Sequence, residues 1–288
     1  MTVSCPSDGC EVRALVSGDL AQSGFTRRVV AGDRAHGSRR PGPFSVRTTL
    51  DAVPHPPGRD VTADDGLLAG QVAYYRRRAR EYDVTAYGDL DAARARITRI
   101  VAALRPAGNV LEIACGTGVW TGALAEAAAT VTAIDAAPEA IDIARGRVTA
   151  GNVRFEVADV FSWNAPARFD TVFFAFWLSH VPASRFGPFW RQLRGLVAGH
   201  GRVLLVDEHP DVGGKEDYAA GSDEIICRRL ADGSGHRLVK VFVRPGQLSA
   251  RLRQLGWQSR IRRDGPDWVI GEARPREPQV HSRQAGQD

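Results

Sequence analysis

The chain has very little lysine. Lys215 and Lys240 are the only two lysines among 38 basic residues, and arginine supplies the rest. The formal net charge is +5, and the arginines are spread along the 288 residues instead of gathering in one block. A scattered charge of this size disfavours a nucleic-acid-binding stripe.

Long hydrophobic runs and cysteines are also scarce. No apolar run reaches the roughly 18 residues that a membrane span needs, although 43% of the residues are hydrophobic and can form a large core. The four cysteines, Cys5, Cys10, Cys115 and Cys227, are not expected to form a disulfide framework, since Cys115 lies within a glycine-containing motif. The opening MTVSCPSDGC has no apolar signal-peptide region. We therefore expect a cytoplasmic protein.

The two ends of the chain lack periodic apolar positions. Residues 1–62 contain stretches such as RRVVAGDRAHGSRRPGPF and VPHPPGRD, and residues 277–288 are polar. Such segments bury too little apolar surface to offset the entropy lost on ordering. The sequence predicts a disordered N-terminal extension over 1–62, one domain over 63–276 and a disordered tail over 277–288.

Between these ends, helical and strand-like patterns alternate. This alternation predicts a parallel sheet with helices on both faces. Two later stretches, 225–243 and 257–275, each contain an Asp-Gly turn signal and predict antiparallel hairpins at one edge of the sheet. The expected fold class is a doubly wound, Rossmann-like α/β fold around a seven-stranded sheet with antiparallel C-terminal strands. Helices are expected over 66–83, 89–106, 118–129, 138–150 and 184–198, and parallel strands over 109–116, 130–135, 153–159, 169–176 and 201–208.

Candidate ligand-binding residues follow four of the predicted strands. Gly116 and Gly118 follow the first, Asp135 ends the second, Asp159 ends the third and His180 lies just after the fourth. Ligands of open α/β sheets bind at the carboxyl ends of the strands. An acidic residue about twenty positions after a glycine turn can accept hydrogen bonds from both hydroxyls of a ribose. Alternatively, aspartates at strand ends cap the next helix.

Four motifs in this order make the chain recognisable. LEIACGTGVWT, TAIDAAPEAIDIAR, FEVADVFSW and FDTVFFAFWLSHVP resemble the small-molecule class I S-adenosylmethionine-dependent methyltransferases. The resemblance extends from Leu68 to Pro275. It implies an enzyme with S-adenosylmethionine as its cofactor, so that residues 63–276 would be a methyltransferase domain. A phosphate-binding GxxxxGKS/T loop and a GxGxxG motif are both missing, as is a Tyr-x-x-x-Lys pair, which argues against a dinucleotide-dependent reductase.

The resemblance also implies which residues hold the cofactor. The glycine turn would approach the methionine part and the ribose, with Ala114 standing where the usual pattern has its first glycine. Asp135 matches the residue that binds the ribose hydroxyls. The N-terminal helix is expected to fold over the cofactor, with Tyr75, Arg78 and Tyr82 near its carboxylate or the acceptor. The implied cofactor-binding set is Tyr75, Arg78, Glu112, Ala114, Cys115, Gly116, Gly118, Asp135, Ala136, Asp159, Val160, Phe161 and Phe176.

His180 is the candidate catalytic base. Methyl transfer needs a base only when the acceptor has a proton to lose, and a histidine pKa near 6.5 suits that step. An alternative is that His180 only orients its loop. Phe176 and Trp177 are candidates for an apolar acceptor pocket, which the hairpin over 225–243 would help to cover. We expect transfer to an oxygen or nitrogen, and less readily to a carbon or sulfur, of a small hydrophobic or aromatic metabolite, such as those of secondary metabolism.

Other interpretations stay open. Arg76, Arg77, Arg78 and Arg80 could contact the phosphates of a nucleic acid such as RNA, but acidic neighbours and the FWLS sequence after the fourth strand disfavour a nucleic-acid acceptor. No metal is expected, although Asp207, Glu208 and His209 end the fifth strand. A protein of the same fold could also bind S-adenosylmethionine without transferring its methyl group. The oligomeric state is not predicted.

Overall fold

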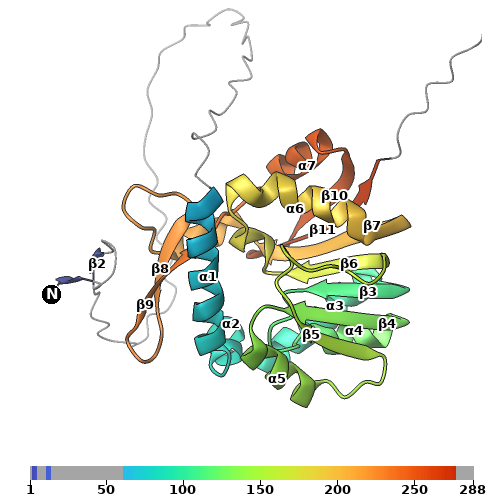
Figure 1. The fold of residues 1–288 in the computed structure, drawn as a ribbon, viewed down its shortest axis with the longest axis horizontal. Coiled ribbons are helices and arrows are strands. Elements are labelled where there is room, and N and C mark those ends of the chain that lie inside the picture. Colours follow the sequence, from blue (N-terminus) through green and yellow to red (C-terminus); the bar gives the residue numbers. More distant parts are fainter. Residues whose placement is uncertain (1, 5–10, 14–60, 277–288) are drawn as a thin grey trace, which may run out of the picture.

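A seven-stranded sheet forms the centre of the molecule (Figure 1). The computed structural model describes residues 2–4, 11–13 and 61–276. The strand order is β10-β11-β7-β6-β3-β4-β5, with parallel pairing from β7 to β5 and antiparallel pairing of β11 with β7 and of β10 with β11. This arrangement confirms the predicted fold class. The strands are β3 (Asn109–Ile113), β4 (Thr130–Asp135), β5 (Val153–Val157), β6 (Phe169–Ala175), β7 (Val197–Glu208), β10 (Trp257–Asp264) and β11 (Trp268–Pro275).

Helices cover both faces of this sheet. The predicted helix over 66–83 is two helices, α1 and α2, because the chain leaves helical geometry after Arg78. One helix, α7, was not predicted, although it begins with Pro245 and buries Leu248 and Leu252 at helical spacing. The helices are α1 (Val61–Arg78), α2 (Tyr82–Tyr87), α3 (Leu90–Leu104), α4 (Thr121–Ala127), α5 (Pro138–Arg147), α6 (Ala183–Leu196) and α7 (Pro245–Gln254), with short 3₁₀ turns η1 (Leu178–His180) and η2 (Pro210–Lys215).

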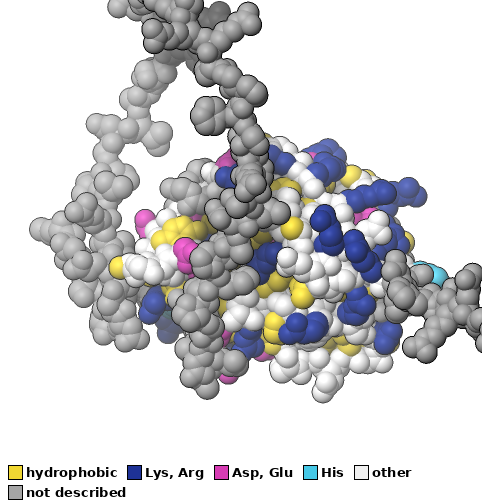
Figure 2. Space-filling view, turned by 90° about the horizontal axis from the view of Figure 1, so that it is seen from above, with side chains coloured by type: hydrophobic (Ala, Val, Ile, Leu, Met, Phe, Trp, Pro, Cys, Tyr) yellow, Lys and Arg dark blue, Asp and Glu magenta, His cyan; other side chains and the backbone are white. Residues whose placement is uncertain are grey.

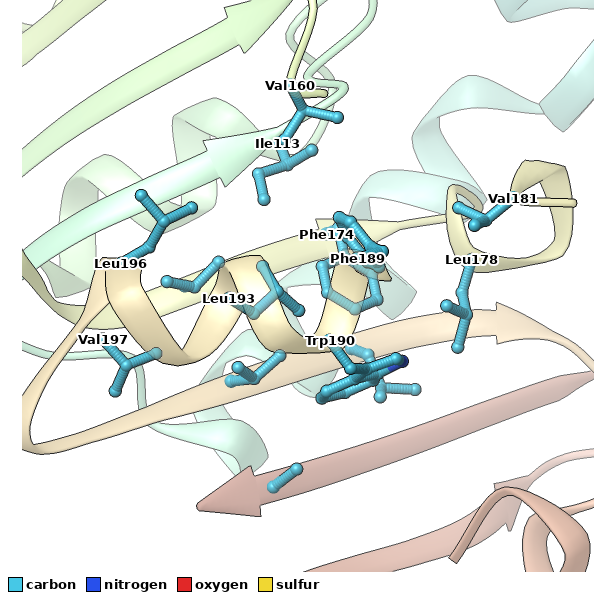
Figure 3. Close-up of a cluster of buried hydrophobic side chains, with 14 of the residues drawn as sticks. Ile113, Val160, Phe174, Leu178, Val181, Phe189, Trp190, Leu193, Leu196 and Val197 are labelled. Carbon is cyan, nitrogen blue, oxygen red and sulfur yellow. The ribbon is translucent and has the colours of Figure 1, made fainter. Parts of the chain in front are cut away.

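The strands are apolar on both sides because each face of the sheet is covered. Leu111 and Ile113 of β3 pack into the cluster under α6, whereas their neighbour Val110 packs with α3 and α4 on the other face. Figure 3 shows Phe189 and Trp190 of α6 facing Phe174 of β6. All of these side chains are at most 1% exposed, so each contributes on the order of 2 kcal/mol by burial.

The first predicted hairpin is not part of the main sheet. Strands β8 (Ile225–Arg229) and β9 (Gly235–Val239) form a separate two-stranded sheet, so the expectation that this hairpin closes the sheet edge was wrong. Ile226 and Leu238 pack on Tyr74 of α1 instead, while β10 and β11 fill the edge. Helix α1 therefore stands between the small hairpin and the main sheet (Figure 1).

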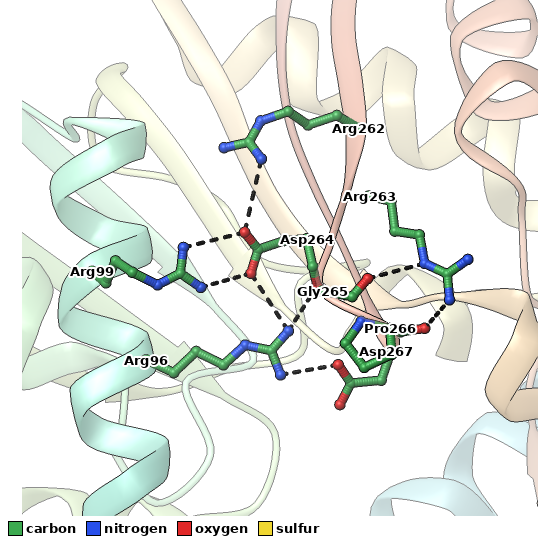
Figure 4. Close-up of polar contacts among 8 residues, drawn as sticks. All are labelled: Arg96, Arg99, Arg262, Arg263, Asp264, Gly265, Pro266 and Asp267. Carbon is green, nitrogen blue, oxygen red and sulfur yellow. Dashed lines mark hydrogen bonds and ion pairs between the residues drawn. The ribbon is translucent and has the colours of Figure 1, made fainter.

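An arginine cluster fixes the β10–β11 turn to α3 (Figure 4). Asp264 is 6% exposed and accepts from Arg99 Nη2 at 2.9 Å, and Arg96 Nη1 donates to Asp267 at 3.0 Å. The Arg99 guanidinium holds the pKa of Asp264 below its usual value. Arg96 and Arg99 therefore have a structural role.

The N-terminal part contains one short pairing. Strands β1 (Thr2–Ser4) and β2 (Glu11–Arg13) pair with each other, within the stretch expected to be disordered. The rest of 1–60 and all of 277–288 lie outside the described residues. Among the helices that are described, none has the length and hydropathy needed to cross a membrane. On the face shown in Figure 2, Lys and Arg side chains stand in separate groups with uncharged surface between them.

Candidate active site

A cavity of about 360 Å³ lies between α1, α2 and the ends of four parallel strands. Its floor comes from the segments after β3, β4, β5 and β6, and its cover comes from the two N-terminal helices. It is lined by Asp65, Leu68, Ala69, Gln71, Val72, Tyr75, Ala79, Tyr82, Ile113, Ala114, Gly116, Thr117, Ile134, Asp135, Ala136, Ala137, Ala140, Ala158, Asp159, Val160, Phe161, Ala175, Phe176, Trp177, His180 and Arg185.

The glycine turn after β3 has the backbone of a close-approach site. Ala114, Gly116 and Gly118 have φ values of 54°, 55° and 79°, in the left-handed region that favours glycine. A Cβ on Gly118 would lie 2.9 Å from that of Ala144, so this glycine allows α5 to pack on the turn. A Cβ on Gly116 would meet nothing within 4 Å, because this residue borders the cavity. Thus one glycine serves packing and the other leaves room for a ligand.

Asp135 forms part of the cavity floor. Its Oδ2 accepts from the Gly116 N–H at 2.9 Å and its Oδ1 from the Ala137 N–H at 2.8 Å. Burial raises the pKa of Asp135, and these backbone donors oppose the rise. A carboxylate has about four acceptor positions, so two remain for the hydroxyls of a ribose. The residue therefore fits a diol ligand.

The segment after β5 forms an apolar slot beside this carboxylate. Asp159 Oδ1 accepts from the Phe161 N–H at 3.0 Å, which fixes the bend after the strand. The ring of Phe161 lies 5.9 Å from that of Trp177, and the Arg185 guanidinium lies 5.1 Å from the Phe161 centroid. With Val160, these groups make walls suited to a flat heterocycle.

Three of the predicted cofactor-binding residues lie behind the cavity wall. Glu112 is 2% exposed, and none of the described residues forms a hydrogen bond with its Oε2. Burial raises the pKa of Glu112 to about 8; contact with Thr121 opposes the rise and the Asp135 carboxylate adds to it. Cys115 is buried in the α3–α4 cluster, and its burial raises the pKa of the thiol. Gly118 is covered by α5, so none of these three lines the cavity.

Arg78 also lies away from the cavity. Its Nη2 donates to Thr85 Oγ1 at 2.8 Å, and its guanidinium lies 4.9 Å from the centroid of the Tyr82 ring. Arg78 lines a different cavity, beside β8. Its structural role is to join α1 to α2, and the cofactor-binding role inferred for it has no support from this geometry. The other predicted residues, Tyr75, Ala114, Gly116, Asp135, Ala136, Asp159, Val160, Phe161, Phe176 and His180, all line the cavity.

His180 is held in one tautomer by the backbone. Its Nδ1 lies 2.7 Å from the Val239 carbonyl oxygen, which can only accept, so Nδ1 carries the proton. Its Nε2 lies 3.0 Å from Tyr75 Oη and accepts from that hydroxyl. Burial lowers the pKa of His180 well below 6.5, and the positive charges of Lys240 and Arg228 lower it further. The imidazole is thus neutral and its basic nitrogen faces Tyr75.

The same junction includes a residue that sequence reasoning missed. Gln71 Nε2 donates to the His180 carbonyl at 3.2 Å, and Gln71 Oε1 accepts from the Val239 N–H at 3.0 Å. Gln71 is 2% exposed. Helical spacing places it on the α1 face of Leu68 and Tyr75, so periodicity is the signal that could have identified it. Asp65 and Arg185, an ion pair that lines the cavity between α1 and α6, were missed as well.

The three polar residues at the end of β7 do not converge. Asp207 Oδ2 accepts from the Ser179 N–H at 2.9 Å, Glu208 pairs with Lys240, and His209 lies 3.3 Å from Asp211. Within 2–4, 11–13 and 61–276, no group of three or more His, Cys, Asp or Glu residues is placed to hold a metal ion. Asp207 instead supports η1, which carries His180, and Lys240, the partner of Glu208, donates to Ser179 Oγ of the same turn.

Comparison with known proteins places this site in a family. A family model described as a methyltransferase domain matches residues 110–201. Ubiquinone biosynthesis O-methyltransferases are similar: that of Xanthomonas euvesicatoria pv. vesicatoria is 31% identical over 52% of this chain and 62% of its own length. That of Xanthomonas axonopodis pv. citri is 32% identical over 57% of this chain and 68% of its own length. The chain thus spans less than two thirds of the first of these relatives.

A solved structure agrees over a larger part of the chain. DhpI in complex with SAH is 39% identical to this chain, with a TM-score of 0.65. The alignment covers 74% of this chain and 99% of the DhpI chain. DhpI has also been solved as a SAM–HEP complex, with the same identity and TM-score. DhpI binds SAH and SAM, and the cavity of this chain offers groups suited to such a ligand: an acceptor for a diol, an apolar slot and an open glycine turn. The chain belongs to the class I S-adenosylmethionine-dependent methyltransferases and uses S-adenosylmethionine as its cofactor.

Proposed function

We propose that this enzyme transfers the methyl group of S-adenosylmethionine to an oxygen or nitrogen atom of a small-molecule acceptor in the cytoplasm. The observation that carries the proposal is the neutral Tyr75–His180 pair on the wall of the cavity that contains Asp135. Only a protic acceptor needs such a pair, because a sulfonium methyl group is already activated. The cavity then has two functions, cofactor binding near Asp135 and acceptor binding near Tyr75.

In this proposal, the cofactor-end residues bind and orient. Asp135 accepts hydrogen bonds from the ribose hydroxyls, Asp159 and Val160 lie at the adenine edge, and Phe161 packs on the base. The glycine turn at Gly116 lets the methionine part lie against the backbone. When bound, S-adenosylmethionine supplies a methyl group on a positively charged sulfur, so the chain contributes mainly alignment.

At the acceptor end, we propose that Tyr75 and His180 take up the proton. Tyr75 Oη accepts the acceptor's proton while its own proton moves to His180 Nε2, and the acceptor atom forms its new bond to the methyl carbon. The C–S bond breaks with its electron pair on sulfur. The positive charge lost from sulfur is matched by that gained on the imidazole, so the site's net charge is unchanged. Burial and the charges of Lys240 and Arg228 disfavour the imidazolium, and the positive charge lost from sulfur offsets part of that cost.

The acceptor proposed is small and hydrophobic or aromatic. Phe176, Trp177 and Tyr82 give the cavity wall a large aromatic share, with Gln71 and Tyr75 as polar groups. The names of the relatives support a small-molecule acceptor, since those proteins are O-methyltransferases of ubiquinone biosynthesis. DhpI has been solved with HEP as well as SAM, which supports a second small-molecule ligand in addition to the cofactor.

A tritium-transfer assay tests the function. The purified full chain would be incubated with S-adenosylmethionine labelled in the methyl group and with separate pools of phenols, alcohols, amines, thiols and total RNA. We expect label in a small-molecule phenol, alcohol or amine. Label in RNA would support the nucleic-acid alternative, and label in no pool, despite cofactor binding, would support a protein that binds S-adenosylmethionine without transferring its methyl group.

A further inference from the structure

A closed set of three side chains joins the cover of the cavity to its floor. Thr117 lies in the glycine turn, Asp83 at the start of α2 and Arg147 at the end of α5. Arg147 Nη1 donates to the Thr117 carbonyl at 2.7 Å and to Thr117 Oγ1 at 3.0 Å, while its Nη2 pairs with Asp83. Thr117 Oγ1 in turn donates to Asp83 Oδ1 at 2.6 Å.

The surroundings make this set stronger than a surface ion pair. The side chains of Arg147 and Asp83 are 20% and 17% exposed, and Thr117 is 2% exposed. Exposed pairs contribute little because water screens them and the side chains lose entropy, whereas partly buried, doubly hydrogen-bonded charges interact more strongly. Arg147 also fills two acceptors of the turn at once, so it holds the turn as well as the helix.

Both ends of the set belong to the cavity wall. Thr117 lines the cavity between two glycines with positive φ, and Tyr82, next to Asp83, lines it from α2. A cofactor that enters or leaves past α2 must separate that helix from the glycine turn. That separation breaks both interactions of Asp83.

We propose that Asp83, Arg147 and Thr117 form a latch that holds α2 on the glycine turn and controls how fast the cofactor and its demethylated product leave. These are positioning residues, since they act through the turn and the helix. The latch raises the lifetime of the bound state and keeps the turn in the shape that the cofactor needs. It depends on cofactor binding alone and on no particular acceptor.

A matched ion pair provides the control. Arg76 of α1 pairs with Glu139 of α5 at 2.9 Å, but both side chains are about half exposed and neither lines the cavity. The pair therefore ties the cover to the body of the protein without touching the glycine turn. Glu139→Gln removes this tie in the same way that Asp83→Asn removes the latch.

The experiment measures dissociation rates of S-adenosylhomocysteine and S-adenosylmethionine from the full chain by stopped-flow displacement. We expect Asp83→Asn and Arg147→Gln each to speed dissociation of both ligands about tenfold or more, because each removes hydrogen bonds to a charged group. Glu139→Gln should change it less than about twofold, as an exposed pair does. Asp83→Glu, which keeps the carboxylate, should restore much of the slow rate.

A double-variant cycle distinguishes the latch from a general loss of stability. The ligands should dissociate from the double variant Asp83→Asn, Arg147→Gln no more than about twice as fast as from either single variant, because the first change already opens the latch. Fully multiplied effects would overturn the proposal. A wild-type dissociation rate in Asp83→Asn would also overturn it. So would a Glu139→Gln variant that releases the ligands as fast as Asp83→Asn does. If Arg147→Gln does not fold, Thr117→Val, which removes only the hydroxyl, gives the same comparison with Asp83→Asn.

Discussion

The two ends of the cavity are built in different ways. The end that we propose for the cofactor consists of short segments that directly follow β3, β4 and β5, and Asp135 contacts the glycine turn only 19 positions before it. The end that we propose for the acceptor joins α1, η1 and β9, with Gln71 hydrogen-bonded to Val239 across 168 positions. One end depends on local turns and the other on packing between distant elements. Function at the first end should be sensitive to changes in backbone conformation, and function at the second end should be sensitive to the replacement of single side chains.

The largest effect is expected at the acceptor end. His180→Asn keeps an N–H for the Val239 carbonyl but removes the basic nitrogen that faces Tyr75. Turnover should fall about 100-fold or more, as on loss of a general base, whereas cofactor affinity should stay within about twofold. The measurement is kcat and the KM for S-adenosylmethionine with the acceptor found in the transfer assay. An equal loss in affinity would mean that His180 serves cofactor binding.

The pH dependence of turnover follows from the same residue. The pKa of His180 is lowered well below 6.5 by burial, so the imidazole stays neutral and able to accept a proton as the pH falls through 6.5. We expect kcat to be level between about pH 6 and 8 and to decline only at lower pH. A decline centred at 6.5 would contradict a buried base and indicate a solvent-exposed imidazole.

Under the cofactor end, Glu112 should govern stability. Its pKa is raised from 4.5 to about 8 in the folded protein, so its contribution is complete below pH 4.5 and is lost as the pH rises through 8. Glu112→Gln removes this loss. The substitution should therefore raise the free energy of unfolding of the cofactor-free protein by on the order of 3 kcal/mol more at pH 8 than at pH 4.5. Urea unfolding at the two pH values measures it. An equal effect at both would show that Glu112 does not change its charge on unfolding.

A smaller effect is expected for the Tyr75 hydroxyl. Tyr75→Phe removes the group between His180 and the proposed acceptor while keeping the ring contacts with Tyr74 and Tyr82. Turnover should fall about tenfold, because water can reach His180 in place of the hydroxyl. The cofactor KM should not change. A wild-type kcat in this variant would remove Tyr75 from the proton path and leave the imidazole to act directly.

The smallest effect concerns the residue that replaces a glycine at the cofactor end. Ala114 has a φ of 54°, which costs an alanine roughly 1–2 kcal/mol. Ala114→Gly relieves that cost but adds unfolded-state entropy, so we expect a net stabilisation below about 1 kcal/mol. Thermal unfolding measures the change. A loss of stability would mean that the Ala114 methyl group packs well enough to outweigh the strained backbone.

The same contrast explains what could be predicted from the sequence. The fold was predicted, and so was the gathering of Asp135, Asp159 and the glycine turn at one cavity, because these residues lie at strand ends, where chain order alone fixes position. Glu112 and Cys115 were assigned to the cofactor by motif, but side chains alternate along the strand and neighbouring turn, so these two are buried behind the wall.

Contacts between distant elements could not be predicted in the same way. The Asp-Gly turn predicted the β8–β9 hairpin, but it gave no indication of what the hairpin packs on. The hairpin packs on α1, and β10 and β11 occupy the sheet edge. The latch between Asp83 and Arg147 connects charges 64 positions apart, with no local signal in either segment. Arg78 lies in a run of three arginines, and the sequence of that run gives no indication of which arginine turns inward.

One set of calorimetric titrations tests the division of the cavity most directly. S-adenosylhomocysteine would be titrated into the wild-type chain, Asp135→Ala and His180→Asn, with NADPH as a control ligand. We predict one-site binding to the wild type, weakened by about 1–3 kcal/mol in Asp135→Ala and unchanged in His180→Asn, and no binding of NADPH. Unchanged affinity in Asp135→Ala, or a loss confined to His180→Asn, would contradict the assignment of the cofactor to the Asp135 end.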